Sequence, residues 1–287
     1  MPDSDRTKLT SLVGEGRLAL VAAHPDDEIV SAGSQLRSLK PAAVVHLTDG
    51  APSDMRDAHA AGFSSRAEYA EARRRESAEA LQAAGAAGAS KLNLGFRDQE
   101  ASLHLAELTL RVRALLLEGD FEAVLTHPYE GGHPDHDAAS FAVHSAIRLL
   151  CSEGRIPPRC LEFTSYHAGK NGMAAEKFLP CRNLTEVVVP LDGPARTEKL
   201  RLLSLFRSQQ RTLSYFPVRC ERFRCAPGYD FTRPPHTGRL FYENYSWGMT
   251  AARWRELARE ALELLDLRES NGSHYLERRL PAGSGRC

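Results

Sequence analysis

Short apolar runs alternate with longer helical stretches through the first half of the chain. Strands are predicted at residues 17–23, 42–47, 91–94 and 121–126. Residues 17–23 are apolar at nearly every position, which is typical of a parallel strand that helices cover on both faces. Between the strands, helices are predicted at residues 28–39, 65–84 and 105–117. This alternation predicts an α/β fold, a Rossmann-like parallel sheet with helices on both faces.

Beyond residue 150 the pattern changes. Strands are predicted at 160–166 and 186–189, and helices at 194–208 and 253–267. Residues 209–247 are rich in Tyr, Phe, Arg, Pro and Gly, which predicts loops with short strands. We expect one α/β domain over 1–268, with the core motifs in 17–150 and a substrate-shaping part of C-terminal strands and helices in 151–268. The polar residues 269–287 predict a disordered tail.

Composition excludes some classes of function. The 287 residues are 42% hydrophobic, enough for a full core, and Lys+Arg and Asp+Glu both number 37. With no net charge, the chain has no field that would attract nucleic acid or an anionic membrane. The first ten residues lack the apolar core of a signal peptide, and no apolar run approaches transmembrane length. We therefore expect a cytoplasmic protein, and the sequence leaves room for a homo-oligomer.

Two polar motifs follow predicted strands. Ala23-His24-Pro25-Asp26-Asp27-Glu28 comes after the first strand, and His133-Pro134-Asp135-His136 comes after the fourth. In parallel sheets, ligands bind beyond the carboxyl ends of the strands, so we expect the motifs to meet there. Each motif also suits a helix start, where acidic residues merely complement the helix dipole. If that alternative held, the same combination of His, Pro and Asp would have to occur after two separate strands without a shared role.

The residue types in these motifs predict metal chemistry. Two histidines and one carboxylate, with an open position for water, form a catalytic zinc arrangement. The spacing alone leaves open which Asp and which His of each motif would bind the metal. A nucleotide-binding dehydrogenase is excluded, because its first turn needs G-x-G-x-x-G to admit a pyrophosphate, whereas this turn is acidic.

These residues resemble the PIG-L/LmbE-like family of zinc-dependent N-acetylglucosaminyl deacetylases. Three further segments are similar to the family, namely Thr48-Asp49-Gly50, Arg73 with Glu76, and Leu94-Gly95-Phe96-Arg97-Asp98. Lys199 and Ser208-Gln209 resemble its weaker C-terminal signature. The resemblance implies a hydrolase that removes the N-acetyl group from an N-acetylglucosamine-type sugar or conjugate and releases acetate. It also implies a small-molecule amino-sugar conjugate as substrate and Zn²⁺ as cofactor, although Fe²⁺ suits the same ligands.

The resemblance also assigns roles to individual residues. The metal ligands it implies are His24, Asp27 and His136. It makes Asp26 the general base and His133 the general acid and oxyanion partner. Arg73 and Asp98 become contacts to sugar hydroxyls. Glu28 has no such role, and we expect it to orient a ligand from behind the site.

Two segments and two other functions stay open at this stage. Residues 127–132 either bring His127 and Tyr129 into the site or only shape the second motif. Residues 209–247 either form a substrate wall or serve as core and surface loops. The same metal site could hydrolyse a non-sugar amide, or the fold could serve a non-catalytic carbohydrate-binding protein. A binding protein would not need Asp26.

Overall fold

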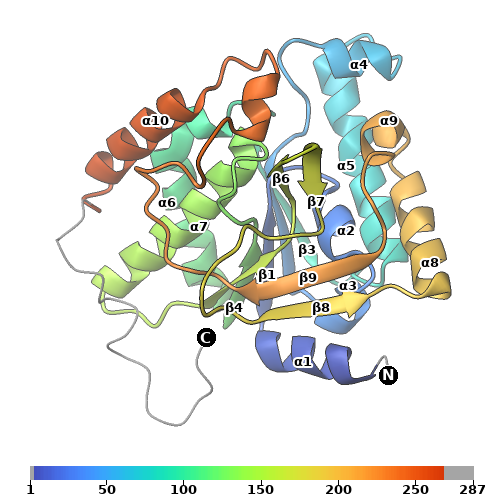
Figure 1. Ribbon diagram of the computed structural model, residues 1–287, viewed down its shortest axis with the longest axis horizontal. Coiled ribbons are helices and arrows are strands. Elements are labelled where there is room, and N and C mark those ends of the chain that lie inside the picture. The colour runs from blue at the N-terminus through green and yellow to red at the C-terminus, as the bar shows by residue number, and fades with distance from the viewer. Residues whose placement is uncertain (1–2, 268–287) are drawn as a thin grey trace.

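A seven-stranded sheet forms the centre of the computed structural model, which describes residues 3–267 (Figure 1). Its strands are β1 Leu18–Ala22, β2 Ala43–Thr48, β3 Ser90–Phe96, β4 Ala123–Thr126, β5 Arg159–Phe163, β8 Glu186–Pro190 and β9 Cys220–Cys225. The strand order is β3-β2-β1-β4-β5-β9-β8. The first five strands are parallel, and β9 runs antiparallel to β5 and β8. The predicted α/β class with a mostly parallel sheet is confirmed.

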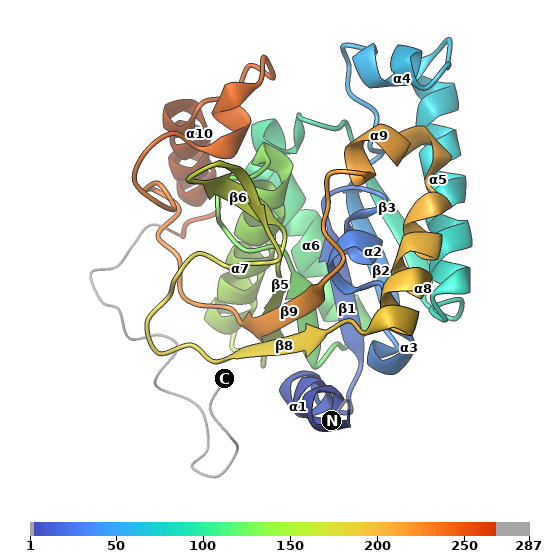
Figure 2. The ribbon, with the colours of Figure 1, turned by 45° about the vertical axis from the view of Figure 1, so that its right-hand side comes forward.

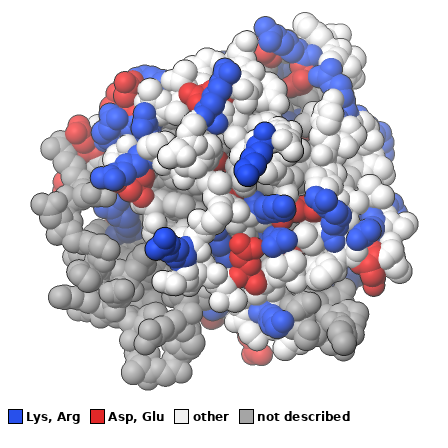
Figure 3. All heavy atoms as spheres, in the orientation of Figure 1, with Lys and Arg blue, Asp and Glu red and all other residues white. Residues whose placement is uncertain are grey.

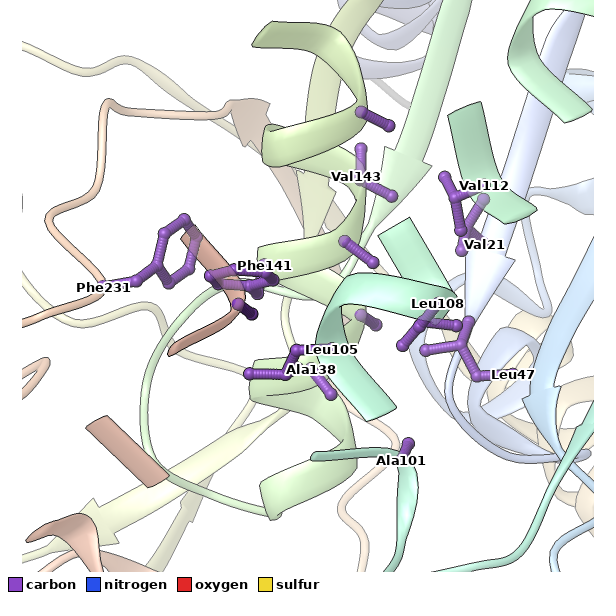
Figure 4. Close-up of a cluster of buried hydrophobic side chains, with 14 of the residues drawn as sticks. Val21, Leu47, Ala101, Leu105, Leu108, Val112, Ala138, Phe141, Val143 and Phe231 are labelled. Atoms are coloured by element: carbon purple, nitrogen blue, oxygen red, sulfur yellow. The ribbon is translucent and has the colours of Figure 1, made fainter. Parts of the chain in front are cut away.

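Helices cover both faces of the sheet (Figures 1 and 2). One face carries α6 Leu105–Gly119, α7 Pro134–Ser152 and α10 Ala251–Leu264. The other carries α2 Asp27–Ala32, α3 Leu36–Leu39, α5 Arg66–Ala83 and α8 Gly193–Ser204, and α1 Asp3–Val13 adds to the same core. Successive residues of β1 divide between the two cores: Val21 packs on the α6 side and Leu20 on the α5 side. Figure 4 shows Val21 beside Val112 and Leu47 beside Leu108, and both Val112 and Leu108 belong to α6.

The helix predicted at 28–39 is instead two short helices, α2 and α3. A continuous helix would bond the Ser34 N–H to the Val30 carbonyl. Here the Ser34 N–H donates to Glu221 Oε1 at 3.0 Å, and Lys199 Nζ donates to the Val30 carbonyl at 2.8 Å. Lys199 and Glu221 are themselves a buried ion pair. This long-range pair replaces the helical bond, and local sequence does not reveal it.

Several smaller elements were not predicted. They are α4 Arg56–Ala60, α9 Gln210–Leu213, the hairpin of β6 Tyr166–Gly169 and β7 Gly172–Ala175, and the 3₁₀ turns η1 Ala101–His104, η2 Arg207–Gln209 and η3 Phe241–Asn244. The helix predicted to reach residue 208 ends at Ser204. The predicted tail, 269–287, lies outside the described residues. β8 and β9, which follow residue 150, join the same sheet as the motif strands, while the domain boundaries 1–268 stay a prediction.

The surface has mixed charge. In the view of Figure 3, basic and acidic side chains lie side by side rather than in separate fields. Between residues 3 and 267, no helix combines the length and the apolar character that crossing a membrane requires.

Candidate metal-binding active site

Loops that follow four of the five parallel strands meet at one edge of the sheet. Residues 23–26 follow β1, residues 97–100 follow β3, residues 127–133 follow β4, and residues 164–165 follow β5. Because these strands are parallel, all four loops leave from carboxyl ends. This is the edge at which α/β sheets bind their ligands.

The first motif forms a tight turn between β1 and α2. Asp27 starts α2, and its Oδ2 accepts the backbone N–H of His24 at 2.8 Å. The same oxygen lies 3.2 Å from His24 Nδ1. One carboxylate thus closes the turn and holds the His24 ring.

The second motif starts α7 and meets the first at Asp27. Pro134 occupies the first turn, and His133 Nδ1 accepts the Asp135 N–H at 3.1 Å. His136 Nε2 lies 3.2 Å from Asp27 Oδ1, so one carboxylate oxygen of Asp27 faces His136 and the other faces His24. On its other side, His136 Nδ1 lies 2.9 Å from Ser165 Oγ, a contact of the kind that orients a metal-binding imidazole.

The residues present fit a divalent metal ion. Three overlapping sets have potential ligand atoms within 4.8 Å of one another: His24 with His133 and His136; His24 with Asp98, His133 and Asp135; and Asp27 with His127 and His136. The three ligands that the resemblance implies are connected through Asp27. Burial lowers the pKa of His136 to about 3 although Asp27 opposes this, so the imidazole is neutral and free to bind a cation.

The charge balance of the site favours a cation. The buried carboxylates of Asp26, Asp27, Asp98 and Asp135 gather around the histidines. Burial raises the pKa of Asp27, but His136 and His127 outweigh it and hold the pKa well below its usual range. Burial likewise lowers the pKa of His24, yet the Asp98 and Asp27 carboxylates hold it well above its usual value. So much buried negative charge needs a positive partner, and a divalent metal would displace the His24 proton.

Asp26 lies beside the histidine set and pairs with Arg73. Arg73 Nη2 donates to Asp26 Oδ2 at 2.7 Å, and Nη1 donates to the Gly50 carbonyl. Gly50 has φ +69°, and a Cβ there would lie 2.6 Å from Arg73 Cζ, so glycine is required for this approach. Burial raises the pKa of Asp26 to about 6 although Arg73 opposes the shift. A carboxyl group with this pKa can exchange a proton near neutral pH.

Glu28 stabilises the first motif through hydrogen bonds. It is fully buried, and its Oε2 accepts the Asp26 N–H at 3.1 Å. His46 Nε2 lies 3.0 Å from the same oxygen, and Ser77 Oγ donates to Oε1 at 2.8 Å. Glu28 therefore fixes the backbone of the general-base candidate, rather than the side chain of a ligand.

The loop before the second motif brings one of its two open candidates into the site. His127 Nε2 accepts the Ala23 N–H at 3.1 Å and lies 3.3 Å from Asp27 Oδ2. Its ring stacks on His136 with centroids 4.1 Å apart. Tyr129 instead packs in the core beside α10. Residues two apart in an extended chain lie on the same face, so the sequence offered no signal that separates His127 from Tyr129.

Asp98 and Asp135 lie beside His24, on the opposite side of its ring from Asp27. Asp98 Oδ1 lies 3.2 Å from His24 Nε2 and 3.8 Å from His133 Nε2. Asp135 accepts the N–H groups of Gln99 and Ala101 at 2.6 and 3.1 Å, so it ties the second motif to the loop after β3. Asp135 and Ser165 were not singled out from the sequence, although Asp135 stands inside the motif. Contacts of Arg73 and Asp98 to sugar hydroxyls stay predictions.

Comparison with known proteins agrees with this picture. The model of the PIG-L family, described as GlcNAc-PI de-N-acetylase, matches residues 19–147, which contain both motifs. No curated protein sequence matches the chain.

Three solved structures have the same fold. The A40926 pseudoaglycone deacetylase is 19% identical, with a TM-score of 0.55 and coverage of 73% of this chain and 96% of its own. The N,N'-diacetylchitobiose deacetylase from Pyrococcus horikoshii is 18% identical, with a TM-score of 0.53 and coverage of 82% and 93%. The zinc-inhibited form of teicoplanin deacetylase is 16% identical, with a TM-score of 0.52 and coverage of 72% and 97%. At these identities the likeness shows the fold.

Proposed function

We propose that the protein is a metal-dependent N-deacetylase of the PIG-L family, whose model matches residues 19–147. Its substrate is an N-acetylglucosamine-type sugar or conjugate, and its products are the free amine and acetate. The observation that carries this proposal is Asp27, whose two oxygens face His24 and His136 while Asp26 lies next to it. The description of the family and the names of the structural neighbours support the same reaction class.

We assign the metal to His24, Asp27 and His136, with Zn²⁺ as the proposed ion and Fe²⁺ also suited to this donor set. When bound, the metal polarises the acetamide carbonyl and lowers the pKa of water. Ser165 holds His136 through Nδ1, and His127 packs flat on the same ring. The chain therefore limits the rotation of the His136 ring from two sides.

Asp26 acts as the general base. Its carboxylate takes a proton from the attacking water, and Arg73 holds that carboxylate in place through Nη2. Glu28 holds the backbone of the same residue. Because burial raises the pKa of Asp26 to about 6, the protonated form can give the proton on to the leaving amine.

His133 stabilises the developing oxyanion. Its Nδ1 accepts the Asp135 N–H, so the neutral ring carries its proton on Nε2. Burial, followed by the nearby His24, lowers the pKa of His133 to about 3, so it serves as a neutral hydrogen-bond donor. This supports the oxyanion role of His133. Its second role as general acid, which the resemblance implies, stays a prediction, and Asp26 is the other group placed to deliver the amine proton.

Three further features of the proposal rest on the sequence. Arg73 and Asp98 contact sugar hydroxyls. The substrate is a small molecule, and neither nucleic acid nor a membrane is a partner. The protein works in the cytoplasm, where a homo-oligomer is compatible with its composition.

Acetate release from a substrate panel tests the function. Purified protein is incubated with N-acetylglucosamine, its aryl glycoside, and N-acetylated amines that lack a sugar ring. We expect acetate from the sugars at least 10-fold faster than from the other amides. The opposite order would assign the same site to non-sugar amides, and no acetate from any compound would favour a carbohydrate-binding protein.

A further inference from the structure

Aromatic side chains gather beside His133 and His136, the two histidines of the second motif. The Tyr166 ring lies 5.2 Å from the His136 ring, and the Trp247 ring lies 4.7 Å from the His133 ring. Tyr166 also contacts Phe216 and Phe241, at 5.6 and 5.4 Å. All four of these aromatic side chains are only partly buried.

Tyr245 extends this group away from the metal ligands. Its ring stacks on Trp247 with centroids 4.5 Å apart and planes 10° apart. Tyr245 is 45% exposed, whereas Trp247 is half-buried between Tyr245 and His133. The stack therefore runs outward from His133 and ends in an exposed ring.

The backbone that carries this stack is fixed to the second motif. The Phe241 N–H donates to the Gly131 carbonyl at 2.9 Å. A Cβ at Gly132 would lie 1.9 Å from the Tyr166 carbonyl oxygen, so glycine allows the β6 segment to approach. Both contacts involve the two residues immediately before His133. The rings consequently keep a set position relative to that histidine.

The segment that carries Tyr245 and Trp247 is the orange chain between β9 and α10 in Figure 1. The Glu243 carboxylate links the two ends of the loop around this pair. Glu243 accepts the N–H of Leu240 at 2.8 Å and that of Ala251 at 2.9 Å. These residues lie on either side of the stacked pair.

Three polar side chains of the segment are bonded within it. Asn244 Nδ2 donates to the Phe241 carbonyl at 2.9 Å, Arg239 donates to the Glu243 carbonyl, and Glu243 accepts two backbone N–H groups. These bonds hold the shape of the loop that carries the stacked pair. The exposed ring of Tyr245 offers a flat, apolar surface, which suits a flat, apolar ligand.

We propose that Tyr245 and Trp247 form an aromatic platform that binds an aromatic ring of the group attached to the N-acetylated sugar. The proposal rests on the proposed function, because the reacting acetamide must lie at His133 for the attached group to reach Tyr245. The platform makes Tyr245 a specificity-determining residue. The preferred substrates are N-acetylglucosaminides with an aryl-bearing aglycone, rather than free N-acetylglucosamine or its alkyl glycosides.

Binding measurements test the platform without depending on turnover. Dissociation constants are measured by calorimetry for the 4-nitrophenyl and methyl glycosides of glucosamine, the product amines. We expect the aryl glycoside to bind the unmodified protein about 3- to 10-fold more tightly than the methyl glycoside, the size of one aromatic stack. Tyr245→Ala should remove this difference, and Tyr245→Phe should retain it because the ring is kept. Ile156→Ala, which removes an exposed apolar side chain near the amino end of β5, should keep the difference as well.

The outcomes separate the platform from the reaction. Equal affinity for the two glycosides, or a difference that survives Tyr245→Ala, would overturn the platform. Tighter binding of chitobiose than of the aryl glycoside would also overturn it, in favour of a second sugar ring. Acetate release from the matching N-acetyl compounds is measured alongside, so a protein that binds aryl glycosides without releasing acetate would contradict the proposed function and leave the platform standing.

Discussion

The floor and the rim of the site are built in different ways. The floor consists of His24, Asp26, Asp27, His133 and His136, which are all buried and contact one another or shared carboxylates. The rim consists of Tyr166, Phe216, Phe241, Tyr245 and Trp247, which are partly or largely exposed and contact one another through ring faces and edges. In the floor, one substitution changes the charge balance of all its neighbours. In the rim, one substitution changes contact area without moving a charge.

Because of this difference, we expect the floor to control the reaction and the rim to control which substrate binds. Buried charges that share partners are strongly coupled, so the floor tolerates little variation and sets the reaction. Ring contacts are individually weak and nearly independent, so the rim can vary and set the substrate. Substitutions in the floor should therefore change turnover, whereas substitutions in the rim should change the Michaelis constant.

The largest effect is expected from Asp26→Asn. The amide is close in shape to the carboxyl group but cannot take a proton from water, so kcat should fall roughly 100-fold or more. Metal content should stay that of the unmodified protein, because Asp26 is not among the proposed ligands. Turnover and bound metal are measured on the same sample. Unchanged turnover would remove Asp26 from the base role, and lost metal would make it a ligand.

An intermediate effect is expected from Glu243→Gln in the loop that carries the rim residues Tyr245 and Trp247. The amide keeps one acceptor oxygen but loses one of the two backbone N–H bonds that close the loop, worth about 1 kcal/mol. KM for an aryl N-acetylglucosaminide should rise about 3-fold, while kcat should stay within about 2-fold. Glu256→Gln, on α10 beside Arg253, is the matched control and should change neither constant. A fall in kcat with KM unchanged would mean that the rim and floor are not separate.

The smallest effect on activity is expected from Glu130→Gln, which should instead change how stability depends on pH. Burial raises the pKa of Glu130 to about 8, partly offset by the bond from the Leu179 N–H and by Arg224. Glu162 and Asp137 also face this group and raise its pKa. In the unfolded chain the carboxyl group ionises near its usual pKa, so the folded state retains a proton that the unfolded state has lost. The free energy of unfolding should therefore fall as pH rises from about 5 to about 8.

Glu130→Gln should flatten that decline by an amount on the order of 1–3 kcal/mol. Some slope should remain, because burial also raises the pKa of Glu162 to about 7. Denaturant unfolding at a series of pH values measures both proteins. Parallel curves for the two would show that Glu130 keeps an ordinary pKa in the folded chain.

Much of the fold follows from local patterns. The strands that helices cover on both faces are apolar because both of their faces are buried, and β1 and β2 illustrate this. Parallel strands also place their carboxyl ends together, which is why the two motifs meet as predicted. The break between α2 and α3 was missed because Lys199 and Glu221, from distant segments, take over a helical hydrogen bond.

The site was predictable where residue type and position coincide. His24, Asp27 and His136 could be chosen from motif and resemblance. Ser165 could not, because a serine after a strand has no distinctive pattern until its distance to His136 is known. Most of the rim lies in residues 209–247, whose composition suggested either a substrate wall or ordinary loops, and the stacking of Tyr245 on Trp247 is the observation on which the proposed platform rests.

Metal titration tests the central claim most directly. Chelator-treated protein is supplied with increasing Zn²⁺, and acetate release from an aryl N-acetylglucosaminide is followed, with Asp27→Asn as the control. Activity should rise from background and reach its plateau near about one equivalent of metal, while Asp27→Asn should stay near background and bind little metal. Full activity in the metal-free protein, or an unchanged response in Asp27→Asn, would contradict the assignment of this floor as a metal-dependent deacetylase site.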